Sequence, residues 1–188
     1  IGCTSVSRRD RRESEIPMSE ARSGASVKQV AREDAAAISA LAREIWYPHY
    51  AAIISRAQIE YMLAQRYDPE IIRAELASGD AWWDKLLVNG MMMGFSSCFL
   101  TGIPGEMKLD KLYVHHDHQR QGYGGMLLDR VLGIARAHGC TTLILAVNKH
   151  NPTAIAAYRK YGFRIAGSVV KDIGGGFVMD DFIMVRDV

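Results

Sequence analysis

Long apolar runs are missing from this chain of 188 residues. A helix that crosses a membrane needs about 20 consecutive apolar residues, and no segment comes near that length. The arginines near the N-terminus are also not followed by the apolar stretch of a secretory signal. These absences argue against a membrane protein and predict a soluble protein of the cytoplasm.

Cysteine is scarce as well. Cys3, Cys98 and Cys140 are odd in number and lie far apart in the sequence. Small secreted domains held together by disulfides have many paired cysteines, so this set is typical of free thiols in a reducing compartment. We assign these thiols no chemistry.

An excess of charge of one sign is also lacking. The 23 basic and 21 acidic residues leave a formal net charge of +2, too little to attract nucleic acid or a membrane surface by the overall field. Residues 8–12 form a basic cluster, but Asp10 interrupts it, which favours a solvated tail. Nucleic acid is therefore disfavoured as a partner.

The length and composition predict one domain preceded by an arm. Residues 1–26 are rich in Ser, Arg and Glu and have few large apolar side chains, so burial cannot offset the entropy lost on ordering them. We expect a disordered arm there. Residues 27–188 are enough for a single folded domain, and the 48% hydrophobic content of the chain can build one sizeable core.

Alternating and helical periodicities predict the elements of this domain. Ser55 and Asp68-Pro69 are typical helix starts, Gly79 and Gly162 are helix ends, and Asn89-Gly90 favours a tight hairpin. Strands are expected at residues 27–32, 81–88, 91–100, 106–114, 141–147, 163–170 and 177–185; helices at 35–46, 56–67, 69–78, 122–138 and 152–161. The predicted fold class is α/β (α+β), with a mixed, mostly antiparallel central sheet of about seven strands and helices on both faces.

A glycine-rich turn between the strand at 106–114 and the following helix has the features of a phosphate site. Gly122 and Gly124 remove side chains from the turn, and the start of a helix presents backbone N–H groups and the positive end of its dipole. A dinucleotide-binding turn would instead follow the first strand of the fold and be followed by an acidic residue about 20 positions later. By itself the turn therefore fits either a pyrophosphate site or an ordinary turn, because glycine serves both, and it does not fit the pattern for NAD.

The pattern Gln119-x-x-Gly122-x-Gly124 resembles the acetyl-CoA signature of the GNAT superfamily of N-acetyltransferases. The preceding strand and the segment from Asn151 through Tyr158 to Gly162-Phe163 are similar to segments of that family in both spacing and order. The resemblance implies transfer of an acetyl group from acetyl-CoA directly to a primary amine within a ternary complex. The alternative is a non-catalytic module that binds acyl-CoA; a nucleic-acid-directed acetyltransferase ranks below both.

The resemblance also implies roles for particular residues. Tyr158 would be the general acid near the CoA sulfur, since a phenol can donate a proton to a thiolate; on periodicity alone it would be a packing residue. Asn151 would contact the pantetheine arm, although an Asn before Pro152 is equally suited to cap a helix. The implied residues that bind the co-substrate are Leu112, Tyr113, Val114, Gln119, Arg120, Gln121, Gly122, Tyr123, Gly124, Gly125, Asn151 and Tyr158.

The general base is where the sequence departs from the family pattern. Many relatives have Glu at the position of Lys108. Asp110 and Glu106 share a strand face and could relay a proton through water. Alternatively, Asp110 forms a salt bridge with Lys108 or Lys111, or no dedicated base exists.

Two further sites stay open on sequence alone. His115-His116-Asp117-His118 contains common metal ligands, but we expect adjacent histidines to splay apart and predict no metal. The resemblance implies that the aromatic residues of segment 46–54 form the wall on the acceptor side, although a core cluster would explain most of them, and Glu60, Asp180 or Asp181 could supply an acidic anchor. The exposed edge of the C-terminal hairpin makes a homodimer conceivable.

Overall fold

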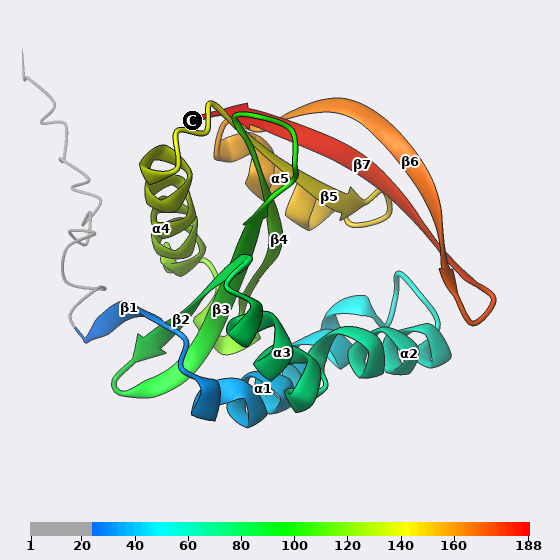
Figure 1. Cartoon of the computed structure of the whole chain (residues 1–188). Coiled ribbons are helices and arrows are strands. Elements are labelled where there is room, and N and C mark those ends of the chain that lie inside the picture. The colour runs from blue at the N-terminus through cyan, green and yellow to red at the C-terminus, as the bar shows by residue number, and fades with distance from the viewer. Residues whose placement is uncertain (1–23) are drawn as a thin grey trace, which may run out of the picture.

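The computed structural model describes residues 24–188, in which seven strands form one sheet in the order β1-β2-β3-β4-β5-β7-β6 (Figure 1). Only β4 and β5 pair in parallel; the other neighbours are antiparallel. The predicted fold class is thereby confirmed. The strands are β1 (Ala25–Gln29), β2 (Ala81–Val88), β3 (Met91–Leu100), β4 (Glu106–Val114), β5 (Thr142–Asn148), β6 (Arg164–Gly174) and β7 (Phe177–Asp187).

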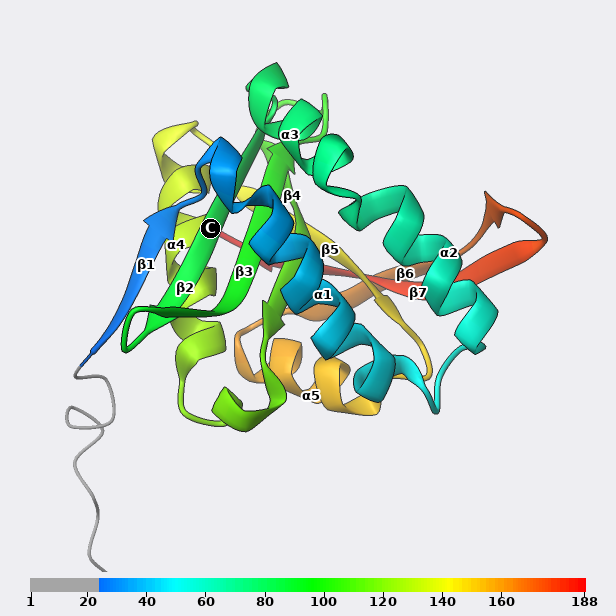
Figure 2. The same ribbon diagram turned by 90° about the horizontal axis from the view of Figure 1, so that it is seen from below.

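Helices cover both faces of this sheet (Figure 2). On one face lie α1 (Ala35–Tyr50), α2 (Arg56–Tyr67) and α3 (Pro69–Ser78), whose apolar side chains form one core cluster with Trp83 and Phe95. On the other face lie α4 (Tyr123–Ala137) and α5 (Pro152–Lys160), which pack over a second cluster centred on β4 and β5. Within the described residues, no helix combines the length and apolar character needed to cross a membrane.

Local signals in the sequence explain most element boundaries. The Ser55 side chain accepts a hydrogen bond from the Gln58 amide at the start of α2, and Asp68 does the same for Glu70 at the start of α3. Gly79 ends α3 with a φ of 73°, in the left-handed region that glycine adopts without strain. The hairpin between β2 and β3 turns at Asn89-Gly90, as predicted.

Several boundaries differ from the prediction. Strands β6 and β7 extend to Gly174 and Asp187, because they pair with each other along most of their length. Strand β1 ends at Gln29 and begins at Ala25, because Ala25 pairs with Val88 and the Gly24 carbonyl accepts a hydrogen bond from the Asn89 amide. Helix α1 continues through Pro48 to Tyr50, since a proline near the end of a helix removes only one backbone hydrogen bond. The arm expected at residues 1–26 lies, up to residue 23, outside the described residues.

The sheet opens in its middle, and this opening positions the site. β4 and β5 pair only where Glu106–Lys108 lies beside Thr142–Ile144. In β4, Leu109 and Lys111 face adjacent residues of β3, so Asp110 forms a bulge. Past these pairs, the two strands diverge, and among residues 24–188 no strand lies beside the edge of β4 that faces β5.

The hairpin of β6 and β7 closes this opening on one side. It curves away from β5 until its tip reaches α2 (Figure 1). There, the Tyr61 hydroxyl donates a hydrogen bond of 2.9 Å to the Ile173 carbonyl. The Gln58 side chain donates another of 2.9 Å to the Val178 carbonyl. These contacts hold the hairpin against α2, so that it borders the opening between β4 and β5.

Candidate active site

A cavity of about 1350 Å³ occupies the gap between β4 and β5 and passes through the sheet. Its lining on one face comes from the end of β4, the loop before α4, and α5. On the other face, it is lined by α1, α2 and the hairpin of β6 and β7. Two molecules can therefore enter from opposite faces of the sheet and meet in the gap.

The glycine-rich turn lies at one end of this cavity. Gly122 is the N-cap of α4 with a φ of 83°, and its carbonyl accepts hydrogen bonds from the amides of Gly125 and Met126. The Gln119 side chain donates to the Val114 carbonyl at 3.0 Å, which fastens the turn to the end of β4. Backbone amides in the first turn of a helix favour an anion, so this end of the cavity suits a phosphate.

Most of the residues expected to bind the co-substrate line the cavity, but three of them do not. Tyr123 is 4% exposed and packs in the core beneath the turn, and Gln121 donates a hydrogen bond to the Asp117 carbonyl. These two and Gly125 do not line the cavity. Those that line it are Leu112, Tyr113, Val114, Gln119, Arg120, Gly122, Gly124, Asn151 and Tyr158.

Tyr158 projects from α5 into the cavity and packs edge-on against Phe163 at 5.6 Å between ring centroids. Burial raises the pKa of this phenol to about 12. The hydroxyl therefore keeps its proton at neutral pH, as a proton donor must. Its position on the same cavity as the turn and the β4 edge suits a role near a thioester.

Asn151 caps α5 and also orients a histidine. Its Oδ1 accepts a hydrogen bond from the Ala154 amide at 3.1 Å, so the capping role is realised. Its Nδ2 lies 2.9 Å from Nε2 of His49 on α1. Burial lowers the pKa of His49, which favours its neutral form. No motif in the sequence links Asn151 to His49, because 102 positions separate them.

Asp110 is held by two cations at the β4 bulge. Its Oδ2 lies 2.6 Å from Arg66 Nη2 and 2.7 Å from Lys111 Nζ. Burial alone would raise the pKa of Asp110, but the charges of Lys111 and Arg66 outweigh it and hold that pKa well below its usual range. The structure thus contains the salt bridge with Lys111 that the sequence left open, and a carboxylate held in this way is a weak proton acceptor.

The other two residues considered for the base are placed differently. Glu106 accepts a hydrogen bond of 2.7 Å from the Thr101 hydroxyl and does not line the cavity. Lys108 does line it, with its ammonium 5.6 Å from the centre of the Phe99 ring. Glu106 is absent from the cavity lining and Lys108 carries an ammonium, so neither of them places a free carboxylate in the cavity to act as the base.

Aromatic residues line the half of the cavity expected to receive the acceptor. Within segment 46–54, Trp46, His49 and Tyr50 reach the cavity. The hydroxyls of Tyr50 and Tyr113 lie 3.1 Å apart, which links α1 to β4 at the gap. Burial, followed by the neighbouring Tyr113, raises the pKa of Tyr50 well above its usual value. Neutral phenols and an indole form a wall suited to an organic amine.

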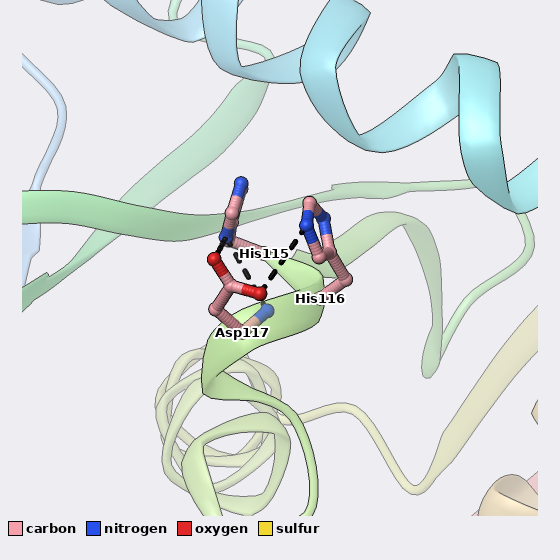
Figure 3. A group of neighbouring side chains, drawn as sticks. All are labelled: His115, His116 and Asp117. Carbon is pink, nitrogen blue, oxygen red and sulfur yellow. Dashed lines mark hydrogen bonds and ion pairs between the residues drawn. The ribbon is translucent and has the colours of Figure 1, made fainter.

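The histidine cluster lies outside this cavity, at the end of β4 (Figure 3). The rings of His115 and His116 lie only 4.0 Å apart between centroids, so the expectation that they splay apart is wrong. The Asp117 carboxylate lies between them, 3.8 Å from His115 Nδ1 and 3.3 Å from His116 Nε2. His115 Nδ1 also accepts a hydrogen bond from the Asp117 amide, so the turn itself accounts for the clustering.

Comparisons with known proteins agree with this geometry. Residues 38–163 match the family described as Acetyltransferase (GNAT) family. The chain is 26% identical over 164 residues to spermidine N(1)-acetyltransferase of Thermoplasma acidophilum, covering 85% of this chain and 95% of that protein. It is 35% identical over 82 residues to the ribosomal protein bS18-alanine N-acetyltransferase of Escherichia coli, covering 44% of this chain and 54% of that protein.

Solved structures share the fold. The PaiA N-acetyltransferase of Thermoplasma acidophilum in complex with coenzyme A superposes with a TM-score of 0.72 at 24% identity, covering 87% of this chain and 99% of that one. A GCN5-related N-acetyltransferase of Rhodopseudomonas palustris gives 0.73 at 23% identity, covering 87% and 95%. Since the family match spans most of the chain, this protein belongs to the acetyltransferase (GNAT) family and is an acetyl-CoA-dependent N-acetyltransferase.

Proposed function

We propose that this enzyme acetylates a small primary amine or an exposed peptide amine, with acetyl-CoA and the amine entering the cavity from opposite faces of the sheet. One observation carries the proposal: a single cavity in the gap between β4 and β5 is lined by the glycine-rich turn before α4, by the protonated phenol of Tyr158 and by the aromatic residues of α1. Two relatives act, by their names, on spermidine and on an alanine of a ribosomal protein, which are amines of these two classes.

In this proposal, acetyl-CoA lies along the gap. Its pyrophosphate binds at the N-terminus of α4 beside Gly122 and Gly124, where backbone amides and the helix dipole favour negative charge. Its pantetheine arm pairs with the backbone of Leu112 to Val114, which lies past the last pair with β5. The thioester then reaches Tyr158 at the centre of the cavity.

Transfer of the acetyl group to an amine that is protonated in solution releases one proton overall. A neutral amine attacks the thioester carbonyl, a C–N bond forms, and the C–S bond breaks. Tyr158 donates its proton to the departing sulfur and regains one from the nitrogen, which leaves an amide and the free thiol. The proton that the ammonium form loses before attack goes to a base or to solvent.

The test is an acetyl-CoA consumption screen over spermidine, monoamines, amino acids, aminoglycosides and peptides with a free N-terminus. We expect turnover in one class of primary amine and formation of the N-acetyl product by mass spectrometry. Consumption of acetyl-CoA with none of these acceptors would remove the proposal. A protein that only bound acyl-CoA would show binding without product, but the matching relatives are named as enzymes, which does not favour that reading.

Binding of acetyl-CoA is expected to raise the melting temperature of the protein by about 5–10 °C at a concentration of about 100 times its Kd. Gly122→Ala should lose more than half of this rise, because φ at this position is 83° and a left-handed conformation costs an alanine about 1–2 kcal/mol, so the turn would shift away from the conformation that binds the pyrophosphate. The measurement is a thermal melt with and without acetyl-CoA.

The matched control is Gly133→Ala in the same helix, where an added Cβ meets nothing within 4 Å. This variant should keep the full rise in melting temperature. An equal rise in the Gly122 and Gly133 variants would contradict the placement of the pyrophosphate.

We also propose a cytoplasmic location and allow a homodimer. Cys98 and Cys140 are free and buried, which suits a reducing compartment. β6 is the edge strand of the sheet and exposes Val169 and Val170, so a second copy could pair there. Light scattering of the purified protein measures the oligomeric state directly.

A further inference from the structure

Three acidic residues were candidates for the anchor of the acceptor, and their surroundings differ. Glu60 forms an exposed ion pair with Arg56 and does not line the cavity. Asp180 forms an ion pair with Lys149 and also lies outside the lining. Asp181 lines the cavity, and its Oδ1 is shielded from solvent without a hydrogen-bond partner among the described residues.

The register of β7 places Asp181 in the cavity wall. Met179, Asp181 and Ile183 alternate along the strand, and all three line the cavity. Asp181 pairs with Asn148 at the end of β5 and with Val169 in β6. It therefore stands where β5 ends, on the opposite side of the gap from β4.

Asp181 also lies within electrostatic reach of the proposed reaction centre. Burial and Tyr113 have the largest effects on the pKa of Tyr50, and the charges of Tyr158 and Asp181 raise it further. The Tyr50 hydroxyl is 3.1 Å from that of Tyr113 on β4. The pKa of the Tyr50 hydroxyl is thus affected both by Tyr158, the proposed proton donor, and by the Asp181 carboxylate on the other side of the gap.

A carboxylate in this setting gains from a cationic ligand. Burial and then the neighbouring Asp180 raise the pKa of Asp181, while Lys108, Lys149 and Arg66 lower it less. Asp181 is half-buried, and a shielded carboxylate oxygen without a hydrogen-bond donor costs free energy in the folded state. A primary ammonium would supply both the donor and the opposite charge, and a carboxylate with a raised pKa accepts a proton more readily.

We propose that Asp181 binds the ammonium group of the acceptor and takes its proton, so that the amine attacks the thioester in its neutral form. This deepens the proposed function and rests on it. Of the three ammonium protons, one passes to Asp181 and then to solvent, one reaches the CoA sulfur through Tyr158, and one remains on the amide. The acceptor class is an amine that is protonated in solution.

The test compares Asp181→Asn with Glu60→Gln, which makes the same carboxylate-to-amide change at a candidate anchor that does not line the cavity. The probe is the amine from the screen that the wild type acetylates fastest. For Asp181→Asn, kcat/KM for the amine should fall about 30-fold or more, since hydrogen bonds to charged groups are the stronger ones. KM for acetyl-CoA should stay within about twofold, as the carboxylate lies on the acceptor side.

Thermal stability supplies a second readout. Asp181→Asn should melt at the same or a higher temperature than the wild type at pH 7, because it removes the charge from a half-buried carboxylate whose shielded Oδ1 has no hydrogen-bond partner among the described residues. A fall in melting temperature together with equal losses for both substrates would indicate a structural role and overturn the proposal. Unchanged kinetics of Asp181→Asn would overturn it while leaving the proposed function intact, whereas a wild type inactive on every amine would remove both.

Discussion

Replacement of Tyr158 by phenylalanine is expected to lower kcat about 100-fold, since a positioned general acid contributes about 10²–10⁴ to a rate. The change removes only the hydroxyl, and the ring keeps its contact with Phe163. Binding of acetyl-CoA should therefore remain within about twofold. Steady-state kinetics with the best amine and titration calorimetry with coenzyme A measure the two quantities separately.

Tyr47→Phe is the control for this substitution. Tyr47 lies on α1 and does not line the cavity, so loss of its hydroxyl should leave kcat within about twofold. If Tyr158→Phe kept the wild-type kcat, the thiolate would receive its proton from water, and Tyr158 would be a packing residue.

Asp110→Ala is expected to destabilise the fold by about 3–5 kcal/mol, because it breaks a buried ion pair by removing one partner. Lys111 is only 2% exposed and would keep Glu75, 3.4 Å away, as its remaining carboxylate. Its ammonium lies 4.5 Å from the Trp83 ring and cannot reach bulk water without repacking. Urea denaturation at pH 7 measures the loss.

The pH dependence of this loss has a definite sign. Because the folded-state pKa of Asp110 is depressed, its contribution to stability is present above the unfolded pKa of about 3.9 and is lost as the pH falls below it. The difference between the wild type and Asp110→Ala should therefore shrink as the pH drops below about 4. Asp129→Ala, an exposed acid on α4, should change stability by less than about 0.5 kcal/mol at any of these pH values.

Local chemistry explains why the sequence predicted so much of the fold. Caps such as Ser55 and Asp68 act within three residues of their partners, and the turn at Asn89-Gly90 fixes its own hairpin. Such features need no knowledge of the distant chain. The glycine-rich turn could be read for the same reason.

Long-range pairings could not be predicted. Arg66 and Asp110 are 44 positions apart and meet only because the fold brings the end of α2 within reach of the β4 bulge. His49 reaches Asn151 across 102 positions. The choice of Asp181 over Asp180 depends on which face of β7 turns toward the cavity, although the alternation of Met179, Asp181 and Ile183 could have indicated that they share a face.

The short parallel pairing between β4 and β5 divides the sheet into two parts. One part is β1 to β4, the other is β5 to β7, and three residue pairs at Glu106–Lys108 join them within the sheet. A molecule bound along the open edge of β4 would take the place of a missing strand and connect the two parts. Acetyl-CoA would then stabilise the relative position of the two parts of the sheet, in addition to its role as a reactant, and so make the acceptor side of the cavity more rigid.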